Sequence, residues 1–254
     1  MKFNQTAVTR RLSFNRPLWL AVFVFSLAAV ALLRADDTMA QPPHAVDASH
    51  RHYLPAGKPD VTALLAPPPL PDSAEQSADL EEVRAVYHAA TSNDMAIAHS
   101  QKKFTVFTFA PEVGAFFQSD HLPKTAAFFH RVQRDAEGVT DNAKVFYQRP
   151  RPYVTDPSLA NGKLEKSFSY PSGHSTESMV LADLIPDKHD AIITEARSIG
   201  WHRVEIARHY PTDIYAGRVL ARAIVRQMQA NPGFQKDFAE AKAEIAAAQK
   251  LAAN

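Results

Sequence analysis

Cysteine is absent from the 254-residue chain, which excludes disulfide bonds, thiolate metal sites and cysteine nucleophiles. Excess charge is almost absent too, because 28 Lys and Arg residues face 27 Asp and Glu residues and the net charge is +1. Such a chain has no broad basic face for a nucleic acid, so we expect no nucleic acid partner. Any anion site must come from a local cluster of cations.

Long apolar runs are scarce, and the one substantial run extends from Leu18 to Leu33. No other run reaches the length of about 18 apolar residues that a membrane span requires, which excludes a protein with several spans. At 16 residues, the run is short for a span and typical of a signal-peptide core. It follows four basic residues, Lys2, Arg10, Arg11 and Arg16.

Small residues after this run indicate a cleavage site at Thr38-Met39-Ala40. We therefore predict a signal peptide over residues 1–40, with Gln41 as the new N-terminus and a periplasmic or secreted location. The alternative is an uncleaved N-terminal anchor. A membrane partner is expected only in that case.

The rest of the sequence indicates a proline-rich arm and one helical domain. Residues 41–75 are rich in Pro, His, Asp and Ala, and predict a linker that becomes ordered near Pro67–Pro69. Over residues 76–254, apolar residues recur at three- and four-residue steps, without alternating strand blocks. The prediction is an all-α, single-domain helical bundle. A strand at Phe104–Phe109 is the weaker alternative, and Phe234–Ala253 predicts a surface helix.

A first group of cations lies between residues 144 and 152. Lys144 is followed, after six residues, by Arg151 and Pro152. Pro150 and Pro152 end a helix, so Arg151 is expected in an extended turn beyond it. Arg149 forms another Arg-Pro pair but lies too close to Lys144 to match, and we expect its charge on the surface or behind the site.

The next motif is Pro171-Ser172-Gly173-His174, which is typical of the start of a helix. Free backbone N–H groups and the positive end of the helix dipole make such a start an anion site. Gly173 allows the backbone to approach an oxyanion closely. Ser172 either caps the helix or donates its hydroxyl to the anion.

The last motif contains Arg203, His209 and Asp213. Pro211 suits the first turn of a helix, which places His209 just before that helix and Asp213 inside its first turn. The four-residue spacing allows the carboxylate to accept a hydrogen bond from one imidazole nitrogen. The other nitrogen would then present its lone pair to the site, as in a catalytic triad.

These motifs resemble the signature of the type 2 phosphatidic acid phosphatase superfamily. Its soluble members include the bacterial class A non-specific acid phosphatases, and vanadium haloperoxidases share its site. The stretches Leu64–Pro69 and Ser169–Ser175 are close to the class A form, and the resemblance covers about residues 64–229. The chain departs from the family at His202, where serine is usual, and its segment between the second and third motifs is short.

The resemblance implies hydrolysis of small-molecule phosphate monoesters without a metal ion or cofactor, and it suggests a homo-oligomer. The implied roles are nucleophile and phosphohistidine for His209, general acid and base for His174, orientation of the nucleophile for Asp213, and phosphate binding for Lys144, Arg151, Ser172, Gly173 and Arg203. Two alternatives share these residues. One is a vanadium-dependent haloperoxidase, and the other is a membrane-tethered phosphatase for lipid or isoprenoid phosphates.

Overall fold

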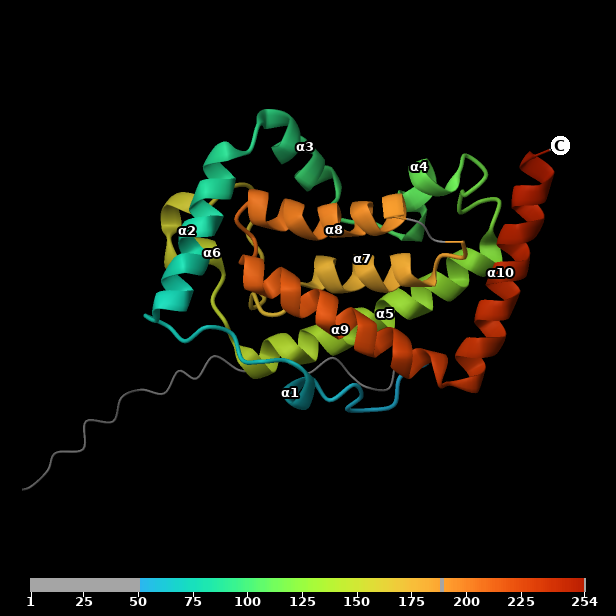
Figure 1. Cartoon of the computed structure of the whole chain (residues 1–254), viewed down its shortest axis with the longest axis horizontal. Coiled ribbons are helices and arrows are strands. Elements are labelled where there is room, and N and C mark those ends of the chain that lie inside the picture. Colours follow the sequence, from blue (N-terminus) through green and yellow to red (C-terminus); the bar gives the residue numbers. More distant parts are fainter. Residues whose placement is uncertain (1–50, 188–189, 254) are drawn as a thin grey trace, which may run out of the picture. The chain divides into compact units, whose positions relative to one another are not determined.

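The computed structural model describes residues 51–187 and 190–253, which belong to one compact unit. No strand occurs in these ranges, so the all-α prediction is confirmed. Figure 1 shows the helices α1 (Val61–Leu64), α2 (Ala74–Ala89), α3 (Ser92–Ser100), η2 (Val106–Phe109), α4 (Ala110–Val113), α5 (Pro123–Tyr147), α6 (Pro152–Thr155), η3 (Pro157–Leu159), α7 (Gly173–Leu184), α8 (Asp190–Glu205), α9 (Pro211–Gln229) and α10 (Pro232–Ala252). The strand alternative at Phe104–Phe109 is wrong, because the short 3₁₀ helix η2 forms there.

Helix α7 is the central element and contacts α5, α8 and α9 (Figure 1). Apolar or small residues occur on nearly all faces of this helix, a pattern typical of a buried helix. Its buried hydroxyls have partners: Ser175 Oγ donates to the Ile214 carbonyl at 2.8 Å, and Ser178 Oγ donates to the Ala196 carbonyl at 2.8 Å. These bonds avoid the cost of burying an unpaired polar group, and they tie α7 to α9 and α8.

Glycines allow the neighbouring helices to approach the first turn of α7 closely. A Cβ atom on Gly217 of α9 would lie 2.8 Å from the Ser172 carbonyl oxygen and 3.1 Å from the Thr176 backbone nitrogen. A Cβ atom on Gly200 of α8 would lie 3.1 Å from Ser175 Cβ. The start of α7 is thus held between two helices with no room for an added methyl group.

We expect Gly217→Ala to destabilise the protein by about 1–3 kcal/mol, as overpacking does. In a helix interior, alanine is usually more stabilising than glycine by roughly 1 kcal/mol. A destabilising effect of Gly217→Ala would therefore show that steric crowding outweighs this gain in helix propensity. The check is the free energy of unfolding in urea. Gly233→Ala is the control, because its added Cβ would meet only the end of the Asn231 side chain, at 3.1 Å. An equal or higher stability of Gly217→Ala would contradict the prediction.

The described part of the proline-rich arm is ordered well before the Pro67–Pro69 run. The buried carboxylate of Asp135 on α5 accepts hydrogen bonds from three successive backbone N–H groups, those of His52 at 2.8 Å, Tyr53 at 2.7 Å and Leu54 at 3.1 Å. The Tyr53 and Leu54 side chains are buried. The arm therefore packs against α5 from residue 52 onward, earlier than the expected position near Pro67–Pro69.

Two tyrosines hold the next part of the arm. The Tyr147 hydroxyl lies 3.2 Å from the Val61 carbonyl oxygen and 3.0 Å from that of Leu65. The Tyr170 hydroxyl donates to the Ala66 carbonyl at 2.6 Å. Both side chains thereby hold the arm on the helices.

The C-terminal helix α10, expected on the surface, buries one of its faces against α5. Phe234 and Phe238 of α10 lie 5.3 and 5.4 Å from Phe128 of α5, measured between ring centroids. Glu244 caps the start of α5 by accepting from the Thr125 backbone N–H at 2.7 Å. The helix is thus anchored at several points and exposes only its remaining faces.

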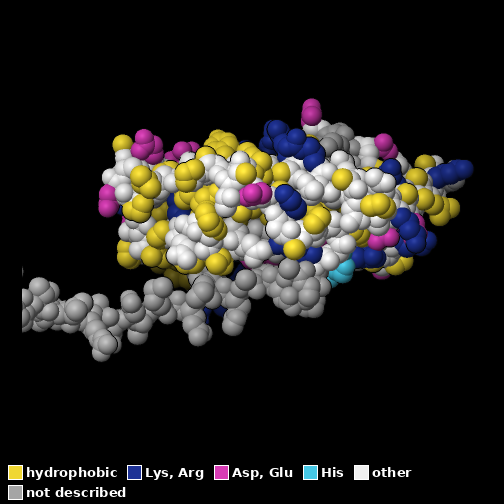
Figure 2. Space-filling model, turned by 90° about the horizontal axis from the view of Figure 1, so that it is seen from below, with side chains coloured by type: hydrophobic (Ala, Val, Ile, Leu, Met, Phe, Trp, Pro, Cys, Tyr) yellow, Lys and Arg dark blue, Asp and Glu magenta, His cyan; other side chains and the backbone are white. Residues whose placement is uncertain are grey.

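The surface carries charges of both signs. Figure 2 shows one face of the molecule, where apolar side chains are interspersed with basic and acidic ones. By contrast, Arg151 and Arg203 are buried, and the side chain of Lys144 is 12% exposed. None of the described helices has both the length and the apolarity needed to cross a membrane. The predicted signal peptide or anchor lies outside the described residues.

Candidate functional site

The three sequence motifs meet where helices begin and end. Lys144 lies in the last turn of α5, Arg151 just before α6, Gly173 at the start of α7, Arg203 near the end of α8 and His209 just before α9. They surround a cavity of about 160 Å³. Its lining residues are Glu137, Asp141, Lys144, Arg151, Glu165, Ser167, Gly173, His174, Glu177, Arg203, Arg208 and His209.

The chain turns sharply between Lys144 and Arg151. Helix α5 ends at Tyr147, and Gln148 adopts the left-handed conformation with φ of 50°. Arg151 is extended, as the flanking prolines predicted, and is the residue immediately before α6. Lys144 and Arg151 therefore reach the same cavity from opposite sides of a turn, rather than from one face of a helix.

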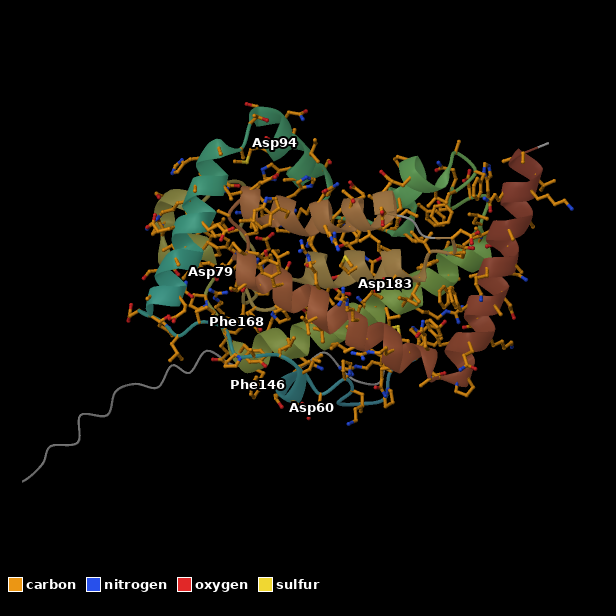
Figure 3. All side chains as sticks on the ribbon, viewed as in Figure 1. Asp60, Asp79, Asp94, Phe146, Phe168 and Asp183 are labelled. Carbon is orange, nitrogen blue, oxygen red and sulfur yellow. The ribbon has the colours of Figure 1, made fainter. Side chains whose placement is uncertain are left out.

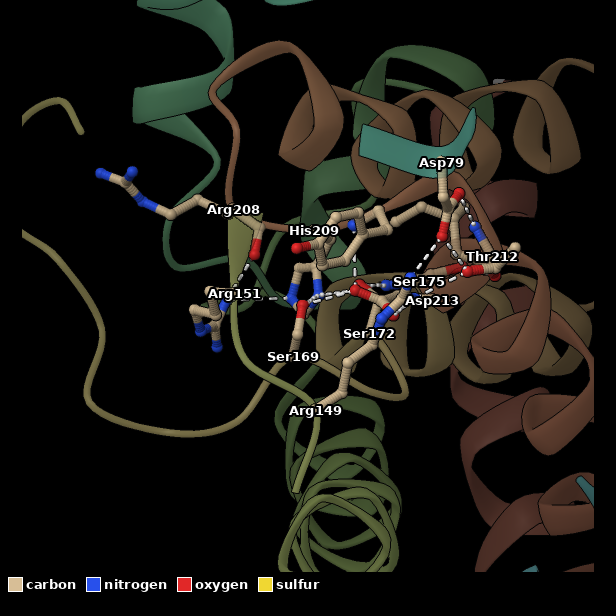
Figure 4. Close-up of polar contacts among 12 residues, drawn as sticks. Asp79, Arg149, Arg151, Ser169, Ser172, Ser175, Arg208, His209, Thr212 and Asp213 are labelled. Carbon is tan, nitrogen blue, oxygen red and sulfur yellow. Dashed lines mark hydrogen bonds and ion pairs between the residues drawn. The ribbon is translucent and has the colours of Figure 1, made fainter. Parts of the chain in front are cut away.

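The Arg151 guanidinium links the cavity wall to His209. Its Nε donates to the Ser167 carbonyl at 2.8 Å, and one terminal nitrogen contacts the Ser167 hydroxyl at 3.0 Å. The other terminal nitrogen donates to the Arg208 carbonyl at 2.8 Å and lies 3.3 Å from His209 Nε2 (Figure 4). These contacts fix the plane of the guanidinium against the imidazole.

The start of α7 has the geometry that an anion site requires. Ser172 is its N-cap, with Oγ accepting from the Ser175 backbone N–H at 3.3 Å. Ser172 thus takes the capping role predicted for it, and it is not among the cavity-lining residues. A Cβ atom on Gly173 would lie 3.5 Å from Lys144 Nζ and 3.4 Å from Glu177 Oε1. The absence of a side chain at Gly173 keeps this space open.

His209 is held by Asp213 from behind. Its Nδ1 lies 3.2 Å from Asp213 Oδ2, which also accepts from the Ser169 hydroxyl at 2.5 Å and from the Tyr210 backbone N–H at 2.9 Å. A proton on Nδ1 satisfies the carboxylate, and the Nε2 lone pair then accepts from the guanidinium of Arg151. This tautomer presents an unprotonated nitrogen to the cavity.

The electrostatics favour this neutral imidazole. Burial and the positive charge of Arg151 lower the pKa of His209 from 6.5 to about 3, although the hydrogen bond to Asp213 opposes the change. Burial raises the pKa of Asp213, but the hydrogen bond from His209 and the charge of Arg149 outweigh it, so the pKa lies below its usual value. Asp213 is therefore an anion beside a neutral histidine at neutral pH.

Arg149 is buried, so the surface alternative predicted for it is wrong. Its guanidinium bridges two carboxylates, with one nitrogen 2.6 Å from Asp213 Oδ1 and another 2.5 Å from Asp79 Oδ2 (Figure 4). It also donates to the Thr212 hydroxyl at 2.7 Å and lies 3.8 Å above the Tyr210 ring. Asp79 comes from α2 (Figure 3), so Arg149 connects α2 to the start of α9 behind His209.

His174 faces the cavity with a nitrogen that is unpaired among the described residues. Its Nε2 atom is buried without a hydrogen-bond partner, and its ring lies 5.5 Å from the Phe104 ring. Burial and the charge of Arg203 lower the pKa of His174 well below 6.5, while a hydrogen bond to the Lys102 backbone opposes the change. His174 is therefore neutral in this structure, and Nε2 is available to a bound group.

Arg203 reaches the cavity despite the short segment between the motifs. It donates to the Ala98 carbonyl at 2.9 Å and lies 3.8 Å from Glu165 Oε1. Burial lowers its pKa to about 10, which leaves it protonated at neutral pH. Glu165 also pairs with Arg208 at 2.9 Å. Neither Arg208 nor Glu165 was predicted from the sequence: adjacency to His209 could have indicated Arg208, whereas Glu165 belongs to no recognisable motif.

His202 points away from the cavity. Its Nδ1 lies 2.6 Å from Gln101 Oε1, and it is not among the cavity-lining residues. The replacement of the usual serine therefore changes a contact between α8 and the end of α3. It leaves the cavity lining unchanged.

Comparisons with known sequences identify relatives of this chain. A sequence profile of the PAP2 superfamily matches residues 135–230. A non-specific acid phosphatase from Providencia stuartii is 30% identical over 210 residues, covering 75% of this chain and 83% of the relative. An acid phosphatase from Zymomonas mobilis subsp. mobilis is 28% identical, covering 73% and 75%, and a non-specific acid phosphatase from Salmonella typhi is 29% identical, covering 54% and 59%.

Proposed function

The chain belongs to the PAP2 superfamily and is a phosphatase, and we propose that it hydrolyses phosphate monoesters through a phosphohistidine on His209, without a metal ion. The proposal rests on the two contacts of the His209 imidazole. Its Nδ1 faces the Asp213 carboxylate, while Nε2 lies 3.3 Å from Arg151 at the cavity wall. Asp213 holds the proton on Nδ1 and leaves Nε2 unprotonated, while the guanidinium of Arg151 beside Nε2 can hold the phosphate that this nitrogen attacks.

In the first step, His209 Nε2 attacks phosphorus, and the bond from phosphorus to the ester oxygen breaks. A proton on His174 passes to the leaving oxygen, which departs as an alcohol. In the second step, His174 takes a proton from water, whose oxygen attacks phosphorus. The P–N bond then breaks, its electron pair returns to His209, and inorganic phosphate is released.

Three cations compensate the charge of the phosphate in these steps. Lys144, Arg151 and Arg203 all line the cavity, and the α7 backbone at Gly173 adds the positive end of a helix dipole. Each cation at about 4 Å from a unit negative charge contributes roughly 4 kcal/mol of attraction at an effective dielectric of about 20, before desolvation. A loose phosphoryl-transfer transition state requires mainly this positioning and charge compensation.

The negative charge of a bound phosphate explains how His174 can be protonated when it acts as a general acid. His174 is neutral in the structure because burial and the charge of Arg203 disfavour its cation. A phosphate dianion in the same cavity reverses the balance of charge and favours the protonated imidazole. The substrate itself thus supplies the conditions under which His174 acts as a general acid.

The test is hydrolysis of p-nitrophenyl phosphate from pH 4 to pH 8 in EDTA. We expect EDTA-resistant turnover that is highest on the acidic side. Because the pKa of His209 is about 3, its lone pair is available throughout this range, and kcat/KM should show no decline toward pH 4. Activity that is lost in EDTA, or a decline below pH 6 typical of an ordinary histidine, would overturn the proposal.

The remaining parts of the proposal concern substrates and location. Relatives with the name non-specific acid phosphatase favour a broad range of small monoesters. A periplasmic or secreted location follows from the signal peptide predicted over residues 1–40. Mass spectrometry of the N-terminus after expression in a bacterium tests it, with Gln41 as the expected first residue.

A further inference from the structure

The phosphate cavity contains a carboxyl group that the proposed reaction does not use. Glu177 lies on α7, three residues after His174, and is partly buried in the cavity wall. Its Oε1 atom lies 3.4 Å from the position of a Cβ on Gly173, and Lys144 Nζ lies 3.5 Å from the same position. Oε1 is therefore within about 7 Å of the lysine, at the glycine end of the phosphate site.

The other oxygen of Glu177 is held from behind by an amide. Gln133 Nε2 donates to Glu177 Oε2 at 2.9 Å and to the Phe104 carbonyl at 3.1 Å. An amide nitrogen only donates, so Oε2 is an acceptor whether the carboxyl is neutral or ionised. In the neutral acid this bond favours the proton on Oε1, the oxygen close to Gly173, because the carbonyl oxygen of a carboxylic acid is a better acceptor than its hydroxyl oxygen.

Burial is the main influence that opposes the ionisation of Glu177. Burial is the largest influence on its pKa, and Glu137 and Asp141 on α5 add to it, whereas the hydrogen bond from Gln133 and the charge of Lys144 act against it. The result is a pKa raised from 4.5 to about 7. Lys144 is shared with Asp141, whose Oδ1 lies 3.4 Å from its Nζ. The other charged and titratable groups that line the same cavity are His174, His209, Arg151, Arg203, Arg208 and Glu165.

We propose that Glu177 is an additional phosphate-binding residue, which donates a hydrogen bond from Oε1–H to a phosphate oxygen when neutral and excludes the anion when ionised. This inference rests on the proposed function, because it requires phosphate in the cavity between Gly173 and Lys144. Below pH 7 the site gains a donor, and above pH 7 it gains a negative charge. The residue thus restricts phosphate binding to acidic conditions without taking part in a covalent step.

The experiment measures the affinity for inorganic phosphate by isothermal titration calorimetry at pH 5.5 and pH 8.5, in the wild type and in Glu177→Gln. The amide keeps a donor but cannot ionise. The ionisation of phosphate and of His174 affects both proteins alike and cancels in the ratio of their dissociation constants. We expect similar affinities at pH 5.5, and at pH 8.5 at least a tenfold weaker affinity for the wild type than for the variant. A ratio that does not change with pH overturns the proposal.

Two further variants secure the result. Glu177→Met takes the place of Glu177→Gln if circular dichroism shows that the amide variant is unfolded. Because methionine lacks both the charge and the donor, this variant should bind phosphate more weakly than the wild type at pH 5.5 and more tightly at pH 8.5. Glu195→Gln is the matched control, because Glu195 on α8 is another partly buried glutamate with a raised pKa but lies outside the cavity. The ratio of its dissociation constant for phosphate to that of the wild type should be the same at both pH values. If this ratio changes with pH as much as the ratio for Glu177→Gln does, the assignment to Glu177 is overturned.

The outcomes separate this inference from the proposed function. Phosphate binding that depends on Glu177 and pH, together with absent turnover, contradicts the phosphatase reaction and supports the role of Glu177. EDTA-resistant turnover, together with a ratio of dissociation constants that does not change with pH, supports the phosphatase reaction and contradicts the role of Glu177.

Discussion

The His209→Ala variant should lose phosphatase activity by a factor of at least about 10⁴ in kcat, since it removes the imidazole that is proposed to form the covalent bond to phosphorus. His209 is the imidazole that contacts both Asp213 and Arg151 at the cavity wall. Hydrolysis of p-nitrophenyl phosphate measures the loss. Rapid quenching in alkali, where phosphohistidine persists, should trap labelled protein from the wild type and none from the variant.

His202→Ala is the matched control for this experiment. His202 is also a histidine close to Arg203 in the sequence, but its imidazole contacts Gln101 and does not line the cavity. We expect its kcat to remain within about threefold of the wild type, as for substitutions away from special features. Labelled phosphoprotein from His209→Ala would place the nucleophile elsewhere.

A large loss of stability is expected for Arg149→Met. Removing the guanidinium leaves the carboxylates of Asp79 and Asp213 close together in the interior without a compensating cation. Breaking a buried ion pair in this way costs about 3–5 kcal/mol, and here the stacking on Tyr210 is lost as well. Unfolding in urea, monitored by circular dichroism, should give a free energy lower by about this amount.

Arg131→Met provides a comparison of the same chemistry at the surface. Arg131 pairs with Asp237 at 2.8 Å, but the arginine side chain is 38% exposed. Pairs of this kind contribute at most about 1 kcal/mol, so the variant should unfold almost like the wild type. Equal losses in the two variants would show that the buried position of Arg149 does not determine its contribution.

The parts of the site that the sequence predicted are those in which nearby residues determine the structure. The prolines around Arg151 end α5 and extend the chain there, whatever the rest of the fold does. Ser172 and Gly173 begin α7 because a capping hydroxyl is followed by a residue without a side chain. His209 and Asp213 meet because they are four residues apart at the start of a helix. The helical fold followed for the same reason, from apolar residues spaced at helical intervals.

The contacts that the sequence did not predict join residues far apart in the chain. Arg149 meets Asp213 and Asp79 across 64 and 70 positions, and neither spacing forms a local pattern. From the sequence alone, Arg149 was therefore indistinguishable from a surface arginine. Glu177 likewise stands one turn beyond a recognised motif, and only the packing of α5 against α7 shows that it enters the cavity. The roles of all these residues in turnover remain predictions.

The carboxylate of Asp135 also fixes how far the N-terminus can be shortened. Its three hydrogen bonds to the backbone at residues 52–54 make this short stretch a part of the folded unit, although it has no helix or strand. Cleavage after Ala40 leaves these hydrogen bonds intact. A protein truncated so that it begins at Pro67 would lack these hydrogen bonds. The carboxylate of Asp135 would then be buried without these partners, and the aromatic side chain of Phe128 would be exposed. A protease that trims the chain should therefore stop before residue 52 for as long as the helices stay packed.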